Sequence, residues 1–285
     1  MEEISDQIFI ESSFAGVSLG AINWPHGLIL IDSPFRVEDI RSWRSALLNM
    51  GGGVDRMLIN LDAHPDRTLG SRAMECSVVG QEKLTHILRS RPVTFKSQGL
   101  ESGAEWELYN TFTGIRWAPP DLSFSDSLQI HWNSEPLLLE HHPGPASGAS
   151  WVVIPSHKLI FIGDAVTVDQ PPFLGFADIP AWLLTLEQLA ANPFQNHLLI
   201  SSRSGIVTQK QVRRMSEFLQ KINAILDELS ARLYPLDEIM HQIPVLLKAF
   251  EFPVERHELY AHRLKWGLER QYYRRYRPTH VEPDE

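Results

Sequence analysis

Residues 58–70 constrain the fold of this chain more than any other segment, because they join a short apolar run to four closely spaced polar side chains. The run Leu58-Ile59-Asn60-Leu61 predicts a buried strand. It leads into Asp62-Ala63-His64-Pro65-Asp66-Arg67, and Gly70 closes the segment. Side chains at i, i+2, i+4 and i+5 after a strand can converge on one point, as a metal site requires. Arg67, however, carries a permanent positive charge, so the loop also indicates a metal site that has lost ligands.

The composition is that of a globular protein with a large core. The chain has 285 residues, of which 43% are hydrophobic and 21% charged, and its net charge of -9 argues against nucleic-acid binding as the main function. The single cysteine, Cys76, excludes an internal disulfide and favours a buried thiol in a reducing compartment. The acidic start (residues 1–6) lacks a signal-peptide pattern, and no apolar run approaches the roughly 20 residues of a membrane span. We therefore expect a cytoplasmic protein without a membrane partner.

The first two thirds of the chain alternate between strand and helix patterns, which is typical of an α/β (α+β) fold. Short apolar or alternating runs, separated by glycine and proline turns, predict strands at 8–10, 17–19, 28–31, 57–61, 122–132, 136–140, 151–154, 159–162 and 197–200. Helical periodicity predicts helices at 37–50, 71–88 and 181–191. The turn at 155–158 predicts that the strands on either side of it pair as a hairpin.

The last part of the chain changes character. Residues 211–233, 236–250 and 254–276 predict three helices, and Pro244 is expected to kink the second. No linker-like composition precedes them. We therefore expect a sandwich domain over residues 1–207 and a helical extension over residues 208–285 that packs on it.

Three further segments place polar residues beside turns or at strand ends. They are the turn His141-His142-Pro143-Gly144-Pro145-Ala146-Ser147-Gly148, the strand end Phe161-Ile162-Gly163-Asp164-Ala165, and Ser202-Arg203-Ser204-Gly205 after the last strand. Side chains at the ends of neighbouring strands meet along one edge of a sheet, where sites are commonly built. We expect these segments to lie near residues 62–67.

Together these segments resemble the metallo-β-lactamase superfamily over residues 8–207. Residues 58–70 are similar to its strand and His-x-His-x-Asp-His loop, and Pro143-Gly144 with Gly148 is similar to its Pro-Gly-His turn. Phe161 to Asp164 is similar to its strand ending in Gly-Asp, and Arg203-Ser204-Gly205 falls where a Gly-His-Gly usually closes the site. The resemblance implies a four-layer αβ/βα sandwich, here followed by a C-terminal helical extension.

The resemblance also assigns positions to the metal ligands of the family. Three histidines usually hold the first metal, and the corresponding positions are Asp62, His64 and Pro145. An aspartate and two histidines usually hold the second, and the corresponding positions are Asp66, Arg67 and Ser204. The bridging aspartate corresponds to Asp164. Arg67, Pro145 and Ser204 cannot ligate in the usual way.

Two functions follow from this ligand set. In the first, Asp62, His64, Asp66 and Asp164 hold one divalent metal (Zn²⁺, Mn²⁺ or Fe²⁺), and Asp66 or Asp62 acts as base for a bound water in a hydrolysis of unknown substrate. In the second, no metal binds and Arg67 neutralises Asp66 and Asp164, whose repulsion at about 4 Å would cost on the order of 4 kcal/mol. The cleft then binds a small anionic ligand held by Arg67, without catalysis. A normal dinuclear mechanism is not expected under either.

The same residues also permit purely structural interpretations. Taken alone, Asp62 and His64 are a helix cap and a loop-corner residue, but their spacing to Asp164 favours a site. Residues 263–277 are basic with interleaved aromatics, a pattern that permits nucleic-acid binding. An amphipathic helix that packs Leu264 and Leu268 on the domain is the favoured interpretation, and the same helix could serve a homodimer contact.

Overall fold

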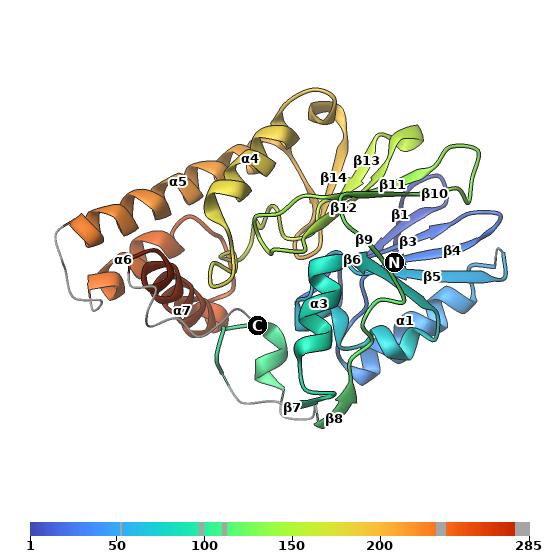
Figure 1. The fold of residues 1–285 in the computed structure, drawn as a ribbon, viewed down its shortest axis with the longest axis horizontal. Helices are drawn as coiled ribbons and strands as arrows, with labels where there is room; N and C mark the ends of the chain where they lie inside the picture. The colour runs from blue at the N-terminus through green and yellow to red at the C-terminus, as the bar shows by residue number, and fades with distance from the viewer. Residues whose placement is uncertain (52, 97–99, 110–112, 232–237, 277–285) are drawn as a thin grey trace.

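Two β-sheets pack face to face, and helices cover the outer face of each (Figure 1). The computed structural model describes residues 1–51, 53–96, 100–109, 113–231 and 238–276. The arrangement is the four-layer αβ/βα sandwich implied by the resemblance, with helices following it at the C-terminus. The predicted fold class is therefore confirmed.

Parallel strands in both sheets determine where the candidate site lies. The first sheet contains β1 (Glu2–Ser5), β2 (Ile8–Glu11), β3 (Leu19–Asn23), β4 (Gly27–Ile31), β5 (Asp55–Ile59), β6 (Ser77–Gln81) and β9 (Leu122–Phe124), adjacent in that order. The second contains β10 (Ser127–Ile130), β11 (Leu137–His141), β12 (Ser150–Ile154), β13 (Leu159–Phe161), β14 (Leu198–Ser201) and β15 (Gly205–Val207), also in order. A separate antiparallel pair consists of β7 (Thr94–Lys96) and β8 (Thr113–Arg116). Because β4 and β5 are parallel, as are β13 and β14, the loops that follow each pair leave from one edge.

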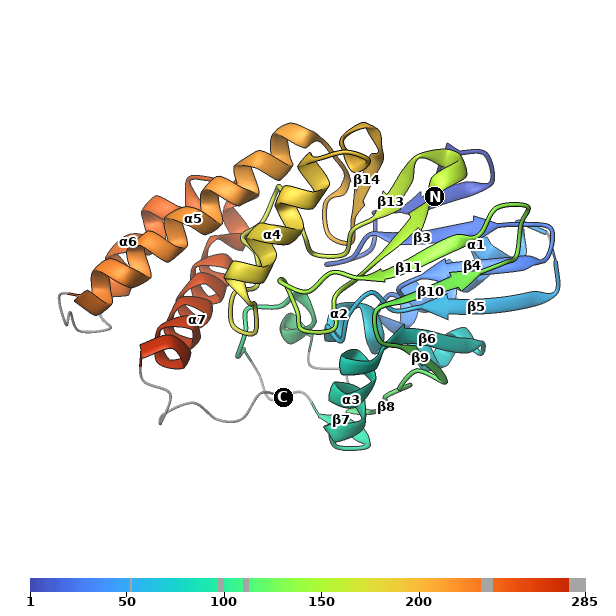
Figure 2. The ribbon, with the colours of Figure 1, turned by 45° about the horizontal axis from the view of Figure 1, so that its top comes forward.

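The helices cover the outer faces of the two sheets, and the last three follow the sandwich at the C-terminus. The α-helices are α1 (Val37–Leu48), α2 (Pro65–Thr68), α3 (Glu82–Ser90), α4 (Ile179–Ala190), α5 (Gln209–Ala231), α6 (Glu238–Leu247) and α7 (His257–Tyr276). Short 3₁₀ turns are η1 (Ser71–Met74), η2 (Glu105–Leu108), η3 (Pro155–His157), η4 (Phe194–Asn196) and η5 (Val254–Arg256). Helices α4 and α5 run side by side over the second sheet (Figure 2). None of the described helices is long and apolar enough to cross a bilayer.

Alternation along the strands explains the layers. In β4, Ile29 and Ile31 pack between the two sheets, whereas Leu28 and Leu30 pack with Trp43 of α1 on the outer side. All five residues of this strand are buried, because both of its faces are covered. The sheet is thus held by apolar contacts on both sides, which gives the loops at its edge a rigid base.

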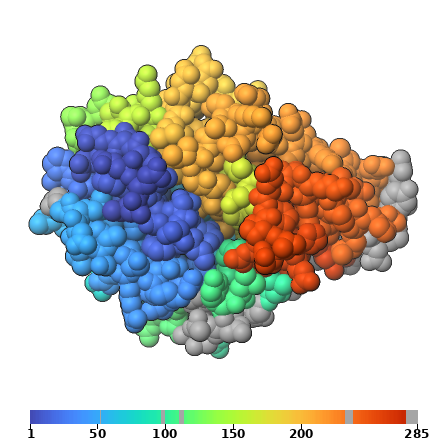
Figure 3. Space-filling model, turned by 180° about the vertical axis from the view of Figure 1, so that it is seen from behind, coloured from blue at the N-terminus to red at the C-terminus, as the bar shows by residue number. Residues whose placement is uncertain are grey.

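The C-terminal helices share one apolar core with the second sheet. Trp151 and Ile160 of that sheet belong to the same buried cluster as residues of α4, α5, α6 and α7. Leu264 and Leu268 of α7 are fully buried in it, on the face that the sequence predicted to pack. Figure 3 shows these helices in orange and red at the opposite end of the face from the blue N-terminal strands. The division at residue 207 stays a prediction, as does a homodimer contact.

Two predicted elements are wrong. Residues 71–88 form η1, β6 and α3 instead of one helix, because Val78 and Val79 join the sheet beside β5 and Gln81 then caps a new helix through Lys83 N. Residues 122–132 form β9 and β10, which belong to different sheets. Pro244 lies inside α6, and the predicted helix ends at 233 and 236 fall outside the described residues, as does residue 277. The predicted hairpin of β12 and β13 is confirmed.

Candidate functional site

Asp32 anchors the loop that carries most of the candidate residues. It follows β4 directly, has a positive φ of 60°, and its side chain is fully buried. The carboxylate accepts hydrogen bonds from Leu61 N at 3.0 Å and from Ser202 Oγ at 3.1 Å. The Asp32 side chain therefore joins the loop after β5 to the loop after β14. Burial raises the pKa of Asp32 to about 7, although Arg67 opposes this rise.

The loop after β5 turns at once into the single-turn helix α2. Pro65 occupies its first turn, where proline fits because no amide donor is needed there. Thr68 Oγ1 donates to His64 O at 2.8 Å, which closes the turn. As a result Asp66 and Arg67 point inward, and both are fully buried.

Arg67 is the first cation of the site. Its Nε and Nη2 donate to the two carboxylate oxygens of Asp62 at 2.8 and 3.0 Å, and Nη2 also contacts Asp164 Oδ2. Burial alone would lower the pKa of Arg67, but Asp164 and Asp62 outweigh it and hold that pKa well above its usual value. The fork of Arg67 therefore links the loop after β5 to the end of β13.

Arg203 is the second cation, and it was missed as a site residue by sequence reasoning. Its Nε donates to Asp164 Oδ2 at 2.9 Å, and its Nη1 donates to Asp66 Oδ2 at 2.9 Å. The prediction that Arg67 neutralises Asp66 as well as Asp164 is thus corrected, because Arg203 is the partner of Asp66. The signal was present in the segment 202–205, where the family pattern directed attention to the neighbouring Ser204.

Asp164 lies between the two arginines, and its position close to residues 62–67 agrees with the sequence prediction. Its Oδ2 is shared by Arg67 and Arg203, whereas its Oδ1 is buried without a hydrogen-bond partner. Burial would raise the pKa of Asp164, but Arg203 and Arg67 hold it far below its usual value. The carboxylate is therefore ionised throughout the physiological range.

His64 lies at the edge of this charged group. Its Nδ1 is 3.6 Å from Asp66 Oδ2, and its ring packs edge-on against Phe173 with centroids 4.3 Å apart. Burial, together with the nearby Arg203 and Arg67, keeps the pKa of His64 well below its usual value. His64 is consequently a neutral imidazole at physiological pH.

The remaining predicted positions, Pro145 and Ser204, form no hydrogen bond with Asp62, Asp66 or Asp164 among the described residues. Pro145 lines a cavity beside the site. Ser204 Oγ donates to Asp169 Oδ1 at 2.7 Å and accepts from Val168 N at 3.0 Å, so it holds its own loop. The structure thus brings together Asp62, His64, Asp66, Arg67 and Asp164, and it adds Arg203.

The donor set does not fit a divalent metal. Arg67 binds both oxygens of Asp62, and Asp66 Oδ1 accepts from Trp106 N at 3.1 Å while Arg203 binds Oδ2. Within the described ranges there is no group of three or more His, Cys, Asp or Glu side chains arranged to hold a metal ion. A metal would have to displace a buried guanidinium, because cations this close repel strongly in a low-dielectric interior.

Helix α7 reaches the site through Arg263. This fully buried side chain donates from Nε to Gly103 O at 2.9 Å and from Nη1 to Gln170 Oε1 at 2.8 Å. The guanidinium carbons of Arg263 and Arg203 lie 4.0 and 4.4 Å from the ring centroid of Phe173, so both cations pack on that aromatic ring. Sequence reasoning assigned Arg263 only to a basic helix and gave no sign of this contact.

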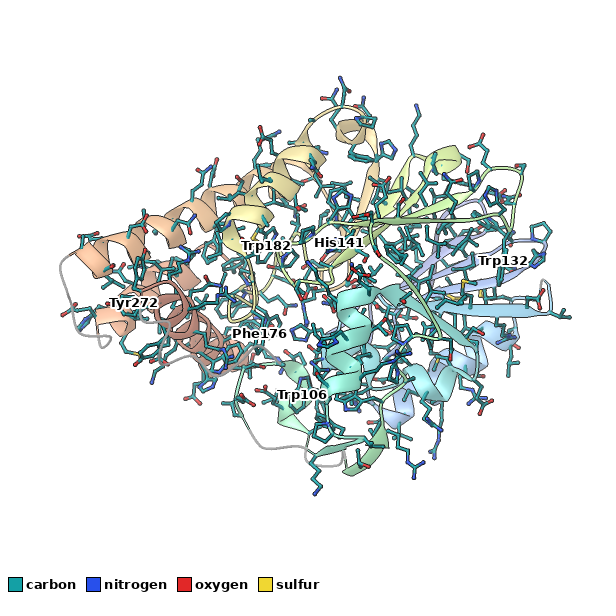
Figure 4. All side chains as sticks on the ribbon, in the orientation of Figure 1. Trp106, Trp132, His141, Phe176, Trp182 and Tyr272 are labelled. Carbon is teal, nitrogen blue, oxygen red and sulfur yellow. The ribbon has the colours of Figure 1, made fainter. Side chains whose placement is uncertain are left out.

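A cavity of about 610 Å³ lies next to this group. Its aromatic lining consists of Trp106, Phe173, Phe176 and Trp266, and residues of α3 line it as well. Phe176 and Trp106 are seen in Figure 4 between the C-terminal helices and α3. His64 also lines the cavity, so its ring and Phe173 separate the open space from the buried arginines.

Asp32 carries a testable consequence for stability. The folded chain retains a proton on Asp32 that the unfolded chain releases above about pH 4, so this residue lowers stability as pH rises from about 4 to about 7. Asparagine has no titratable carboxyl group, so it does not lose stability in this way. We expect the free energy of unfolding of Asp32→Asn, relative to that of wild type, to rise by about 3 kcal/mol from pH 5 to pH 8, as measured by urea unfolding. A difference that does not change with pH would contradict the assignment, and exposed Asp6→Asn is the control.

Comparison with known proteins agrees with the fold. The family model of the metallo-beta-lactamase superfamily matches residues 77–194. No curated protein matches the sequence. Within residues 77–194 the chain thus resembles the metallo-β-lactamase superfamily.

Several solved structures share this fold at low sequence identity. The inverting sec-alkylsulfatase Pisa1 from Pseudomonas sp. aligns with 99% of this chain at 14% identity and a TM-score of 0.72, but the chain spans only 52% of that protein. A metallo-beta-lactamase family protein from Thermus thermophilus aligns over 94% of this chain and 95% of its own, at 16% identity and a TM-score of 0.64. A metallo-beta-lactamase from Pontibacter korlensis aligns over 77% of this chain and 97% of its own, at 18% identity and a TM-score of 0.58. At such identities the similarity establishes the fold alone.

Proposed function

We propose that this protein is a metal-independent binding protein, a pseudoenzyme of the metallo-β-lactamase fold, in which Arg67 and Arg203 take the place of two metal ions. The observation that carries the proposal is that both guanidinium groups are buried and bound to Asp62, Asp66 and Asp164. These are positions that the family resemblance assigns to metal ligands. A fixed protein cation at each half of the site stabilises the carboxylates without metal.

The hydrogen bonds also argue against the hydrolytic alternative. Metal-assisted hydrolysis depends on a cation that lowers the pKa of a bound water, and a guanidinium offers only N–H donors. Both oxygens of Asp66 already accept hydrogen bonds, from Trp106 N and Arg203 Nη1, which leaves the predicted catalytic base without a free oxygen directed at a substrate. The binding function therefore accounts for more of the site than catalysis does.

The ligand would not be held by Arg67 as the sequence suggested. Arg67 is fully buried and is absent from the lining of the cavity, where His64 and Phe173 cover the charged group. In this proposal Arg67 and Arg203 stabilise the buried carboxylates, and the ligand binds in the cavity next to them.

A mononuclear metallohydrolase is the second candidate. It is favoured by Asp164 Oδ1 and His64 Nδ1, which are buried and have no hydrogen-bond partner. Two such donors are fewer than the three or more that protein metal sites usually supply. The binding proposal therefore ranks first.

Metal content distinguishes the two candidates. For protein purified without chelator, we expect elemental analysis to find far less than one metal per chain, and we expect Zn²⁺, Mn²⁺ or Fe²⁺ to leave the melting temperature unchanged. About one metal per chain, lost in both Asp62→Ala and His64→Ala, would support the hydrolase instead. Cys76→Ser serves as a control for adventitious binding to the thiol.

A further inference from the structure

We propose that the cavity beside the arginines binds an amphipathic anion, with an alkyl or aryl body among the aromatic rings and one anionic head group at Lys83 and His86. The inference rests on the proposed binding function and names its ligand class. The cavity volume of about 610 Å³ lies within the range of roughly 300–1,000 Å³ that small organic ligands occupy.

The apolar walls come from segments that are distant in the sequence but fixed in the fold. Trp106 belongs to η2, Phe173 and Phe176 to the loop before α4, and Trp266 to α7. Trp266 packs directly on the backbone of Gly175, where an added Cβ would lie only 2.0 Å from the indole ring. Its ring also meets Phe176 with centroids 5.5 Å apart. The aromatic surface is thus formed before any ligand arrives.

Arginine side chains pack on two of these rings, Phe173 and Phe176, and fix their positions. The two buried arginines that pack on Phe173 leave its remaining surface toward the cavity. Arg270 lies over Phe176, with its guanidinium carbon 4.5 Å from the ring centroid. Rings fixed in this way bind apolar groups with little loss of side-chain freedom.

The groups available to a ligand follow from which wall side chains already have hydrogen-bond partners. Glu107 accepts backbone hydrogen bonds from residues 101–104, and Glu82 accepts one from Ser125 Oγ at 2.8 Å. Arg91 donates to Ala63 O at 3.0 Å and lies over Trp117. Glu101 is a further wall carboxylate, on the segment before η2 and away from α3 in sequence.

Lys83 and His86 differ from these residues. Their side-chain nitrogens form no hydrogen bond or ion pair with any residue that the structure describes, and both side chains line the cavity. They are three positions apart on α3, so they share one face of that helix. An ammonium and an imidazole side by side favour an anionic oxygen group such as a carboxylate or sulfate.

Isothermal titration calorimetry of the full chain tests the inference with four probes of equal chain length. We expect decanoate or decyl sulfate to bind at one site at least roughly tenfold more tightly than decanol, and decyltrimethylammonium to bind more weakly still. The two anions distinguish a carboxylate from a sulfate head group. Equal affinity for decanol and both anions would overturn the inference.

Substitutions on α3 test whether the anion binds at Lys83 and His86. The double variant Lys83→Met, His86→Asn should weaken binding of the preferred anion roughly tenfold, whereas Lys210→Met on the exposed surface of α5 should leave it unchanged. An unchanged affinity in the double variant overturns the inference, provided that thermal melting shows it folded. Metal analysis of the same preparation separates the two proposals. Metal-free protein that binds neither anion overturns only the ligand class, while one metal per chain overturns the proposed function.

Discussion

Arg203→Met is expected to lower the free energy of unfolding by about 3–5 kcal/mol, because it leaves buried Asp66 without its cation and buried Asp164 with Arg67 alone. Arg203 has no exposed side-chain surface, and its fork neutralises both Asp66 and Asp164. Methionine fills much of the same volume, so the loss would come mainly from charge. Equilibrium unfolding in urea at neutral pH measures it.

The matched control is Arg44→Met. Arg44 forms an ion pair with Glu75 at 2.7 Å, but the two side chains are 42% and 69% exposed, so we expect a loss below about 1 kcal/mol. A similar small loss in both variants would show that the buried group does not depend on its cations.

The pH dependence of this difference provides a second readout. Arg203 helps to hold the pKa of Asp164 below its usual value, so this stabilisation is present above the unfolded-state pKa and is lost as pH falls through the folded one. Without Arg203 the carboxylate takes up a proton at higher pH. The gap between wild type and Arg203→Met should therefore narrow toward acid pH, whereas a packing defect would leave it constant.

The fold could be predicted because its signals are local. Strands such as β4 and β12 are short apolar runs bounded by turn residues, and the turn at 155–158 determined how β12 and β13 pair. The segment whose prediction was wrong, residues 71–88, has only the two-residue apolar run Val78-Val79, between Ser77 and Gly80, at the place of β6. A run that short fits a strand or a buried helix equally well, and only its pairing with β5 decides between them.

The candidate site could be predicted in position but not in its contacts. The ends of β5 and β13 bring residues 62–67 and Asp164 together, and the sequence order of these segments anticipated that. Which residue of the turn after β14 points inward depends on its backbone path, and there Arg203 lies inside while Ser204 bonds to Asp169. The contact of Arg263 with the loop before η2 joins residues 160 positions apart, which no local pattern specifies.

Arg67→His should convert this part of the site into one that responds to zinc. Without metal, we expect the variant to lose about 3–5 kcal/mol, since Asp62 and Asp164 lose their shared cation. Histidine beside these two carboxylates and His64 supplies the nitrogen and oxygen ligands that Zn²⁺ accepts. Zinc at about 100 times its dissociation constant would then restore about 2.7 kcal/mol, which thermal melting with and without Zn²⁺ detects.

Arg67→Gln is the control that separates metal binding from simple loss of charge. Glutamine removes the same cation and offers a poorer metal ligand, so zinc should raise the melting temperature of Arg67→His and leave Arg67→Gln and the wild type unchanged. Equal responses in the two variants would mean that zinc binds elsewhere, and that Arg67 does not stand where a metal ion is otherwise held. A response confined to Arg67→His would support the proposal that the Arg67 guanidinium lies where a metal ion can be held by Asp62 and Asp164.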